Sequence, residues 1–171
     1  MDLREYVRAI PDFPEPGILF RDITPLLREP TAVDFALDRM TEWASEREPE
    51  AIVGVESRGF LFGAPLALRL GLPFVPVRKP GKLPAARMSV EYSLEYGQSQ
   101  LDIHADALSA GQRALVVDDL LATGGTAHAA CKLVELLGAQ VCGVLFLIEL
   151  EALGGRERLS AYDVHALIAY P

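Results

Sequence analysis

The chain has 171 residues, close to the length of about 150 that is typical of one domain, and half of its residues are apolar. This composition is sufficient for a packed core and excludes wholesale disorder. The formal net charge of −8 argues against general nucleic-acid binding, which depends on clustered basic charge, but a small anionic ligand remains compatible with it.

The remaining global features favour a soluble, cytoplasmic protein without a membrane partner. The longest apolar run, Val141 to Ile148, is too short to span a bilayer. The N-terminal stretch MDLREYVRAI mixes charges into a helical pattern and lacks the apolar region of a signal peptide. Cys131 and Cys142 have no CxxC spacing and no histidines at metal-ligand spacing, so we expect two reduced core thiols.

The first predicted elements are a helix, a strand and a second helix. Apolar residues recur at helical spacing after Thr31, which is placed to cap the first helix, and the pattern ends before Pro49. A β-branched apolar run predicts a strand at 51–56. Residues 60–70 suit a buried helix, and Pro65 suggests that this helix begins there.

The second half of the chain alternates strands with a helix. Apolar runs predict strands at 72–77, 114–119, 141–149 and 164–170, and we expect a helix at 125–137. Strands that are apolar on both faces and alternate with helices indicate an α/β fold, with a mostly parallel twisted sheet covered by helices on both faces. No linker or repeat divides the chain, so we expect a single domain over residues 1–171.

The segment 80–103 interrupts this alternation. Its part YSLEYGQSQLDI alternates like a β-hairpin, whereas its front part, PGKLPAARMS, is typical of a loop. An insertion between two strands of a sheet is a suitable place for a mobile flap.

The string VVDDLLATGGT, residues 116–126, is a strand–loop–helix junction at the carboxyl end of a parallel strand, where open α/β sheets bind ligands. Gly124 and Gly125 allow positive φ and close approach, so that backbone N–H groups can converge on an anion at the start of a helix. The Thr123 and Thr126 hydroxyls can donate as well. The predicted anion loop is therefore Ala122, Thr123, Gly124, Gly125 and Thr126.

Two acids, Asp118 and Asp119, stand a few positions before this anion loop. Neither GxxxxGK[ST] nor GxGxxG matches the string. Carboxylates repel a phosphate, so a phosphate alone would not explain two acids beside an anion loop. A ligand with a phosphate at one end and hydroxyls at the other explains both features, because the acids can accept from a ribose diol or help to hold a hydrated Mg²⁺. The sequence therefore predicts a sugar-phosphate site.

VVDDLLATGGT resembles the signature loop of type I phosphoribosyltransferases, which bind 5-phosphoribosyl pyrophosphate. Further stretches resemble the adenine phosphoribosyltransferase branch and cover nearly the whole chain in the expected order: PDFPEPGILFRDITPLL (11–27), VESRGFLFG (55–63), RKPGKLP (78–84) and SLEYG (93–97). The resemblance implies transfer of the phosphoribosyl group to N9 of adenine, giving AMP and pyrophosphate with Mg²⁺. It also implies a homodimer, an N-terminal hood segment at about 1–30 and a flap at about 80–103.

The leaving pyrophosphate takes up negative charge as positive charge builds on the ribose, so its departure needs cations preorganised around the leaving oxygens. The resemblance places Ser57 and Arg58 in a pyrophosphate loop, with Arg58 able to bind in bidentate fashion and a cis peptide expected at Glu56–Ser57. The window 78–87 is basic and contains no acid. A solvated loop would also explain that charge, but beside an anion site we expect pyrophosphate contacts from Arg78, Lys79 and Lys82. By resemblance, Arg78 can reach the site of a partner subunit.

The resemblance implies that Leu19, Phe20 and Arg21 bind adenine, with backbone groups matching its N6 donor and N1 acceptor and Phe20 stacking on the purine. Without the resemblance, PGILFRD would be interpreted as a strand that enters the core. Glu95 and Tyr96 are implied to be catalytic together with Arg58. Glu95 and Tyr96 are implied to lie over the ribose and base, with Glu95 assisting proton movement at the purine. Alone, a carboxylate on a hairpin is usually just solvated.

Two alternative functions remain open. A phosphoribosyltransferase for another purine, such as xanthine or guanine, would differ mainly in the base segment. A non-catalytic regulator that senses phosphoribosyl pyrophosphate would need a DNA-reading module, and the residues before Arg21 contain no helix-turn-helix pattern. In the main interpretation, Asp118 and Asp119 hold Mg²⁺ indirectly, through water or substrate.

Overall fold

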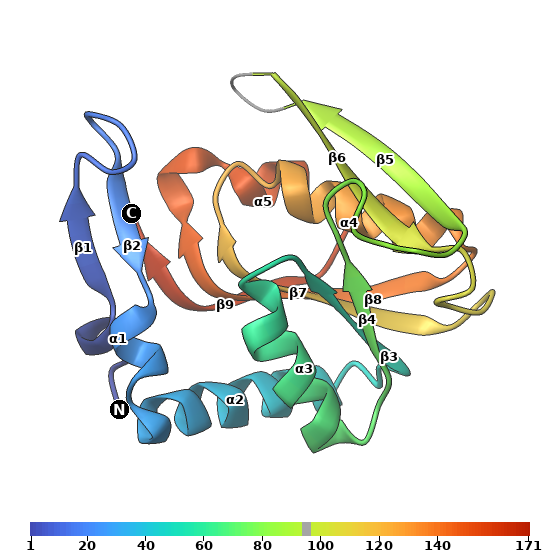
Figure 1. Cartoon of the computed structure of the whole chain (residues 1–171). Coiled ribbons are helices and arrows are strands. Elements are labelled where there is room, and N and C mark those ends of the chain that lie inside the picture. Colours follow the sequence, from blue (N-terminus) through green and yellow to red (C-terminus); the bar gives the residue numbers. More distant parts are fainter. Residues whose placement is uncertain (94–96) are drawn as a thin grey trace. The chain divides into compact units, whose positions relative to one another are not determined.

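The computed structural model describes residues 1–93 and 97–171, in two compact units, Met1–Arg39 and Met40–Pro171. The N-terminal unit contains a 3-10 helix, η1 (Leu3–Tyr6), the antiparallel strands β1 (Arg8–Pro11) and β2 (Leu19–Asp22), the short helix α1 (Thr24–Leu27) and most of α2 (Pro30–Ser45) (Figure 1). No helix in the described ranges is long and apolar enough to cross a membrane. The prediction of one domain over residues 1–171 stays a prediction.

The start of α2 corrects one sequence prediction. Thr31 was expected to cap this helix, but α2 begins at Pro30, and Thr31 lies inside its first turn. Proline is well suited to the first helical position, because its fixed φ is helical and its missing N–H has no partner there anyway. The Thr31 hydroxyl instead donates to Glu29 Oε1 at 2.7 Å.

The larger unit is built on a five-stranded sheet with the order β4-β3-β7-β8-β9, in which every neighbouring pair is parallel. Its strands are β3 (Ala51–Val55), β4 (Phe74–Val77), β7 (Arg113–Leu121), β8 (Gln140–Leu150) and β9 (Val164–Tyr170). All five residues of β3 are buried, as expected for a strand that is covered on both faces. The predicted α/β fold class is therefore confirmed.

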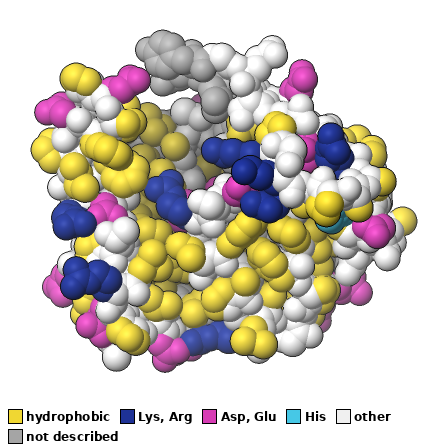
Figure 2. Space-filling model, viewed as in Figure 1, with side chains coloured by type: hydrophobic (Ala, Val, Ile, Leu, Met, Phe, Trp, Pro, Cys, Tyr) yellow, Lys and Arg dark blue, Asp and Glu magenta, His cyan; other side chains and the backbone are white. Residues whose placement is uncertain are grey.

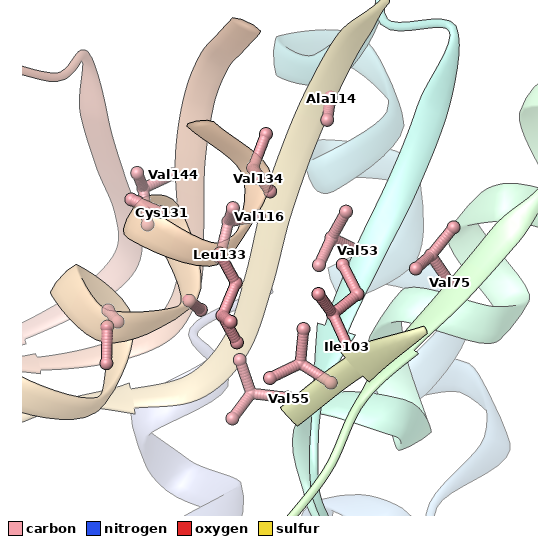
Figure 3. Packing of buried hydrophobic residues seen from close by; sticks show 14 of the residues in the cluster. Val53, Val55, Val75, Ile103, Ala114, Val116, Cys131, Leu133, Val134 and Val144 are labelled. Carbon is pink, nitrogen blue, oxygen red and sulfur yellow. The ribbon is translucent and has the colours of Figure 1, made fainter. Parts of the chain in front are cut away.

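The connections run in opposite directions from the centre of the sheet. The helix α3 (Gly59–Leu70) leads from β3 to β4, and α4 (Gly125–Leu136) leads from β7 to β8. Because such crossovers are right-handed, the reversal of direction places α3 and α4 on opposite faces (Figure 1). On the α4 face, Val53, Val55 and Val116 pack with Leu133 and Val134 (Figure 3).

Two boundaries differ from the sequence predictions. Helix α3 begins at Gly59, and Pro65 lies inside it, because the burial of Phe62 and Leu66 on either side offsets the hydrogen bond that proline cannot donate. Strand β7 continues past the expected end at residue 119 to Leu121. The buried Leu121 side chain and the pairing of Leu121 with Glu149 on β8 extend it.

The segment predicted as a flap forms an antiparallel hairpin of β5 (Arg87–Ser93) and β6 (Gln98–His104), which packs against α4. The hairpin begins earlier than predicted, because Met88 pairs with Ile103 and Val90 with Leu101, and both partners on β6 are buried. Residues 94–96, between β5 and β6 in the sequence, lie outside the described residues. Motion of this hairpin as a flap stays a prediction.

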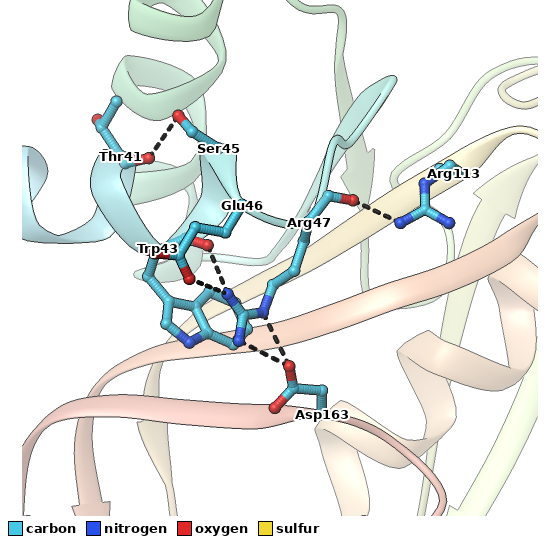
Figure 4. A network of polar contacts seen from close by, with 7 residues as sticks. All are labelled: Thr41, Trp43, Ser45, Glu46, Arg47, Arg113 and Asp163. Carbon is cyan, nitrogen blue, oxygen red and sulfur yellow. Dashed lines mark hydrogen bonds and ion pairs between the residues drawn. The ribbon is translucent and has the colours of Figure 1, made fainter.

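A polar network fixes the end of α2 within the larger unit (Figure 4). The Arg47 guanidinium lies 3.4 Å from the centroid of the Trp43 ring, and its Nη2 is 2.7 Å from Asp163 Oδ2. The Trp43 ring also stacks on His165 of β9, with centroids 5.2 Å apart. Arg113 of β7 donates to the Arg47 carbonyl. These contacts join the end of α2 to both the centre and the edge of the sheet.

Candidate active site

A cleft of about 500 Å³ opens at the carboxyl ends of β3 and β7 in the larger unit. These two strands are neighbours, and their connections leave in opposite directions, so the cleft lies at the topological switch point of the sheet. Near the centre of the face in Figure 2, Lys and Arg side chains gather beside an acidic one. The cleft is lined by Glu56, Ser57, Arg58, Lys79, Tyr92, Ser99, Leu101 and residues 118–127.

The loop between β7 and α4 has the geometry of an anion site. Gly124 adopts φ 81° and ψ 0°, a left-handed conformation that favours glycine, and α4 begins at the next residue. The first N–H groups of a helix have no partner within it and carry partial positive charge. All five residues predicted for the anion loop, 122–126, line the cleft. Of its two glycines, only Gly124 has a positive φ; Gly125 is helical.

The short helix α5 (Gly155–Arg158) follows the 3-10 helix η2 (Glu151–Leu153) and packs directly against this loop. A Cβ on Gly155 would clash with the Ala122 carbonyl oxygen, and a Cβ on Gly124 would lie 2.8 Å from the Gly155 carbonyl oxygen. Arg156 of α5 is held by Glu149 of β8, with Nε–Oε1 and Nε–Oε2 distances of 2.8 and 2.9 Å. This contact between α5 and the loop was not predicted from the sequence, although the Gly154-Gly155 pair is a visible signal of a tight turn.

The two acids are consecutive residues near the end of β7, and Asp119 pairs with Arg58, the residue before α3. Asp119 Oδ2 is 2.9 Å from Arg58 Nε, and the Asp119 N–H donates to Asp118 Oδ1 at 2.9 Å. Burial and repulsion from Asp119 raise the pKa of Asp118 well above the ordinary carboxyl range. Burial also raises the pKa of Asp119, although the Arg58 guanidinium opposes that shift. The pair therefore favours a ligand that brings hydroxyl donors or positive charge.

The turn after β3 supplies the opposite wall of the cleft. The cis peptide that the resemblance implied joins Glu56 to Ser57 and is confirmed. The Glu56 carboxylate accepts from Lys79 N at 2.9 Å and from Arg78 Nε and Nη2, each at 3.2 Å. Burial would raise the pKa of Glu56, but these donors outweigh it and the pKa is lowered. Ser57, Arg58 and Lys79 thus line the cleft, whereas Arg78 is held against Glu56.

Several predicted site residues are not placed in this cleft. Lys82 is not part of its lining, although its charge contributes to the lowered pKa of Glu56. Glu95 and Tyr96 lie outside the described residues, so their catalytic roles stay predictions. The adenine-binding residues Leu19, Phe20 and Arg21 lie on β2 of the N-terminal unit, which is described by itself, and their role stays a prediction as well.

The cleft also contains residues that sequence analysis did not assign, above all Tyr92 and Ser99. These two residues pair across β5 and β6, so their side chains project from the same face of the hairpin. The Thr126 hydroxyl donates to the Tyr92 hydroxyl at 3.3 Å. The alternation of the hairpin was visible in the sequence, but the face that it turns to the anion loop was not.

The donor set fits Mg²⁺ only as an ion that is shared with a substrate. Among residues 1–93 and 97–171, no group of three or more His, Cys, Asp or Glu side chains could hold a metal by itself. Mg²⁺ commonly keeps several waters and binds one or two carboxylates together with substrate phosphates. The adjacent carboxylates of Asp118 and Asp119 at the cleft satisfy that requirement.

The comparisons with known proteins agree with one another. The model of the phosphoribosyl transferase domain matches residues 28–168. The adenine phosphoribosyltransferase of a Synechococcus species is 57% identical over 170 residues, 99% of each chain, and that of Gloeobacter violaceus is 57% identical over 171 residues, 99% of this chain and 100% of that one.

Solved structures are equally similar. The adenine phosphoribosyltransferase of Thermoanaerobacter pseudethanolicus has a TM-score of 0.96 and 52% identity, over 98% of each chain. The Saccharomyces cerevisiae enzyme, solved with adenine and an imino-altritol bisphosphate, has a TM-score of 0.91 and 43% identity, over 96% of each chain. The chain therefore belongs to the phosphoribosyl transferase domain family, in its adenine phosphoribosyltransferase branch.

Proposed function

We propose that this protein transfers the 5-phosphoribosyl group of phosphoribosyl pyrophosphate to N9 of adenine, releasing AMP and pyrophosphate. The observation that carries the proposal is one cleft that combines an anion loop at the start of α4 with two adjacent carboxylates at the end of β7. A sugar phosphate satisfies both halves, because its phosphate faces the loop while its hydroxyls donate to the acids. The names of the similar proteins support adenine as the acceptor.

The donor is proposed to lie along the switch point. Its 5′-phosphate accepts from the N–H groups and hydroxyls of residues 122–126, and its ribose diol donates to Asp118 and Asp119. Its pyrophosphate then extends toward Ser57, Arg58 and Lys79 on the opposite wall. This arrangement holds the ribose at both ends, which fixes the position of C1′ for attack.

Arg58 contributes to the departure of pyrophosphate. A guanidinium carries five N–H donors in a planar fork, so Arg58 can keep its contact with Asp119 and still donate to a pyrophosphate oxygen. Lys79 adds a second positive charge at the same wall. A Mg²⁺ ion, held indirectly through Asp118 and Asp119, would supply further positive charge to the pyrophosphate oxygens when it is bound.

The acceptor side of the proposal rests on the resemblance. The backbone of Leu19 and Arg21 would pair with N6 and N1 of adenine, and Phe20 would stack on the ring. Glu95 would take part in moving a proton at the purine as N9 becomes the nucleophile, with Tyr96 beside it. The proposal also includes a cytoplasmic homodimer in which Arg78 reaches the partner's site.

A substrate panel tests the proposal. Purified protein is incubated with Mg²⁺, phosphoribosyl pyrophosphate and adenine, guanine, hypoxanthine or xanthine in turn, and nucleotide and pyrophosphate are quantified. We expect AMP from adenine and a rate lower by about 10⁴ for the other bases, because a site that matches N6 and N1 leaves buried polar groups unpaired with them. Activity should disappear when EDTA removes Mg²⁺. Absence of AMP, or equal use of guanine, would overturn the proposal.

A further inference from the structure

Tyr92 contacts the anion loop from the hairpin. Its hydroxyl accepts a hydrogen bond from Thr126 Oγ1 at 3.3 Å, and its ring atom Cδ2 lies 3.5 Å from the position that a Cβ on Gly125 would occupy. Tyr92 also lines the cleft. The ring therefore lies against the start of α4, and its hydroxyl meets the Thr126 hydroxyl, which can donate to a bound phosphate.

We propose that Tyr92 is a positioning residue of the 5′-phosphate site, which acts on the bound phosphate through the Thr126 hydroxyl. The inference rests on the proposed function, because it requires a phosphate at residues 122–126. It assigns a role to the hydroxyl of a tyrosine on the hairpin, outside the loop that holds the phosphate.

Each hydroxyl has one proton to donate, so its hydrogen-bond donor can serve one acceptor at a time. Thr126 has one O–H donor, which Tyr92 accepts in the structure. A phosphate oxygen is charged and is the stronger acceptor, so the Thr126 proton turns to the phosphate when that ligand binds. The Tyr92 hydroxyl loses its incoming donor and can then donate to the Thr126 oxygen in return.

The hydrogen bond between the two hydroxyls thus reverses its direction, and a chain forms from Tyr92 through Thr126 to the phosphate. Hydrogen bonds in such a chain polarise one another, so the outer hydroxyl strengthens the inner bond without touching the ligand. Loss of the Tyr92 hydroxyl should weaken phosphate binding by about fivefold, within the range for one hydrogen bond.

The test is the variant Tyr92→Phe, which removes the hydroxyl and keeps the ring. Calorimetric titration with ribose 5-phosphate should show about fivefold weaker binding, whereas the affinity for pyrophosphate should stay unchanged. The KM for phosphoribosyl pyrophosphate should rise by a similar factor while the KM for adenine does not. Unchanged affinity for ribose 5-phosphate, or an equal loss for both ligands, would overturn the inference.

A double-mutant cycle tests the path through Thr126. In a Thr126→Val background the hydroxyl of Tyr92 has no partner to strengthen, so adding Tyr92→Phe should change ribose 5-phosphate binding no further. Independent, multiplied losses would overturn the relay. The matched control is Tyr162→Phe, whose hydroxyl lies 2.7 Å from Glu135 Oε1 outside the cleft and whose loss should leave both ligands unaffected. If the unsubstituted protein binds no ribose 5-phosphate, the proposed function itself fails.

Discussion

Substitution of Gly155 by alanine should distort the anion loop, because the new methyl group would collide with the loop backbone. An ideal Cβ at this position lies 2.6 Å from Leu121 Cδ1 and clashes with the carbonyl oxygen of Ala122. The leucine side chain can turn away, but the carbonyl belongs to the backbone of the loop. Gly155 is not among the glycines with positive φ, so the contact alone, and not the backbone conformation, opposes the alanine.

The size of the effect follows from these contacts. Overpacking of this kind costs about 1–3 kcal/mol of stability, since α5 or the loop must move. A shift of the loop that removes one N–H from a bound phosphate forfeits a hydrogen bond to a charged group, worth about 1.5–3 kcal/mol. We therefore expect Gly155→Ala to weaken ribose 5-phosphate binding by about 10- to 100-fold.

Calorimetric titration measures the loss of affinity for ribose 5-phosphate, and urea unfolding measures the loss of stability separately. The matched control is Gly154→Ala, because a Cβ at Gly154 would meet no atom closer than Glu157 Oε2 at 3.9 Å. The φ of Gly154 is 66°, which an alanine adopts only with strain. That alanine should cost about 1–2 kcal/mol of stability through backbone strain and leave the affinity unchanged. Wild-type affinity in Gly155→Ala, or equal losses of affinity in both variants, would refute the supporting role of α5.

Three further predictions concern charges. Asp118→Asn combined with Asp119→Asn should weaken donor binding and cripple turnover without lowering the melting temperature, because burial already disfavours both charges; retained activity would contradict their role. Asp22→Asn should lower the free energy of unfolding by about 1 kcal/mol at pH 7 and by less at pH 3. Hydrogen bonds from Thr24 and Arg8 lower the pKa of Asp22 in the folded protein, so the stability that this carboxylate contributes is lost as the pH falls below about 4. Urea unfolding at both pH values measures the difference. Arg47→Ala should lower stability by about 1–2 kcal/mol through its ring and ion-pair contacts and leave turnover unchanged, and a normal unfolding midpoint would contradict this.

The sheet could be predicted because its signals are local. A strand that is buried on both faces, such as residues 51–55, appears as a continuous apolar run in any sequence. The anion loop is local as well, since Gly124 and the helix start stand next to each other in the chain. The boundary at Thr31 was wrong because Pro30 takes the first helical position. The boundary at Pro65 was wrong because burial on both sides of the proline outweighed the rule that places proline at a helix start.

The missed residues depend on contacts between distant segments. Gly155 meets Ala122, and Tyr92 meets Thr126, across 33 and 34 positions of sequence respectively. The Gly154-Gly155 pair signals a tight turn, but the sequence near Gly155 or Tyr92 does not identify the partner, because each contact exists only after α5 and the hairpin have packed against α4. The ion pair between Arg58 and Asp119 has the same origin, since it requires β3 and β7 to be neighbours.

The ion pair between Arg58 and Asp119 also explains how two acids and a phosphate loop can share one cleft. Two full negative charges at the end of β7 would repel an arriving phosphate, and burial makes such charges costly in the free protein. The Arg58 guanidinium, 2.9 Å from Asp119, offsets one of them before any ligand arrives. In the proposed function, the start of α4 then attracts the phosphate through backbone N–H groups, which belong to no charged side chain. The negative carboxylates lie on β7 and the partial positive charge lies at the start of α4. One ligand can therefore direct its hydroxyls to β7 and its phosphate to α4, although these two sites are only a few residues apart in the chain.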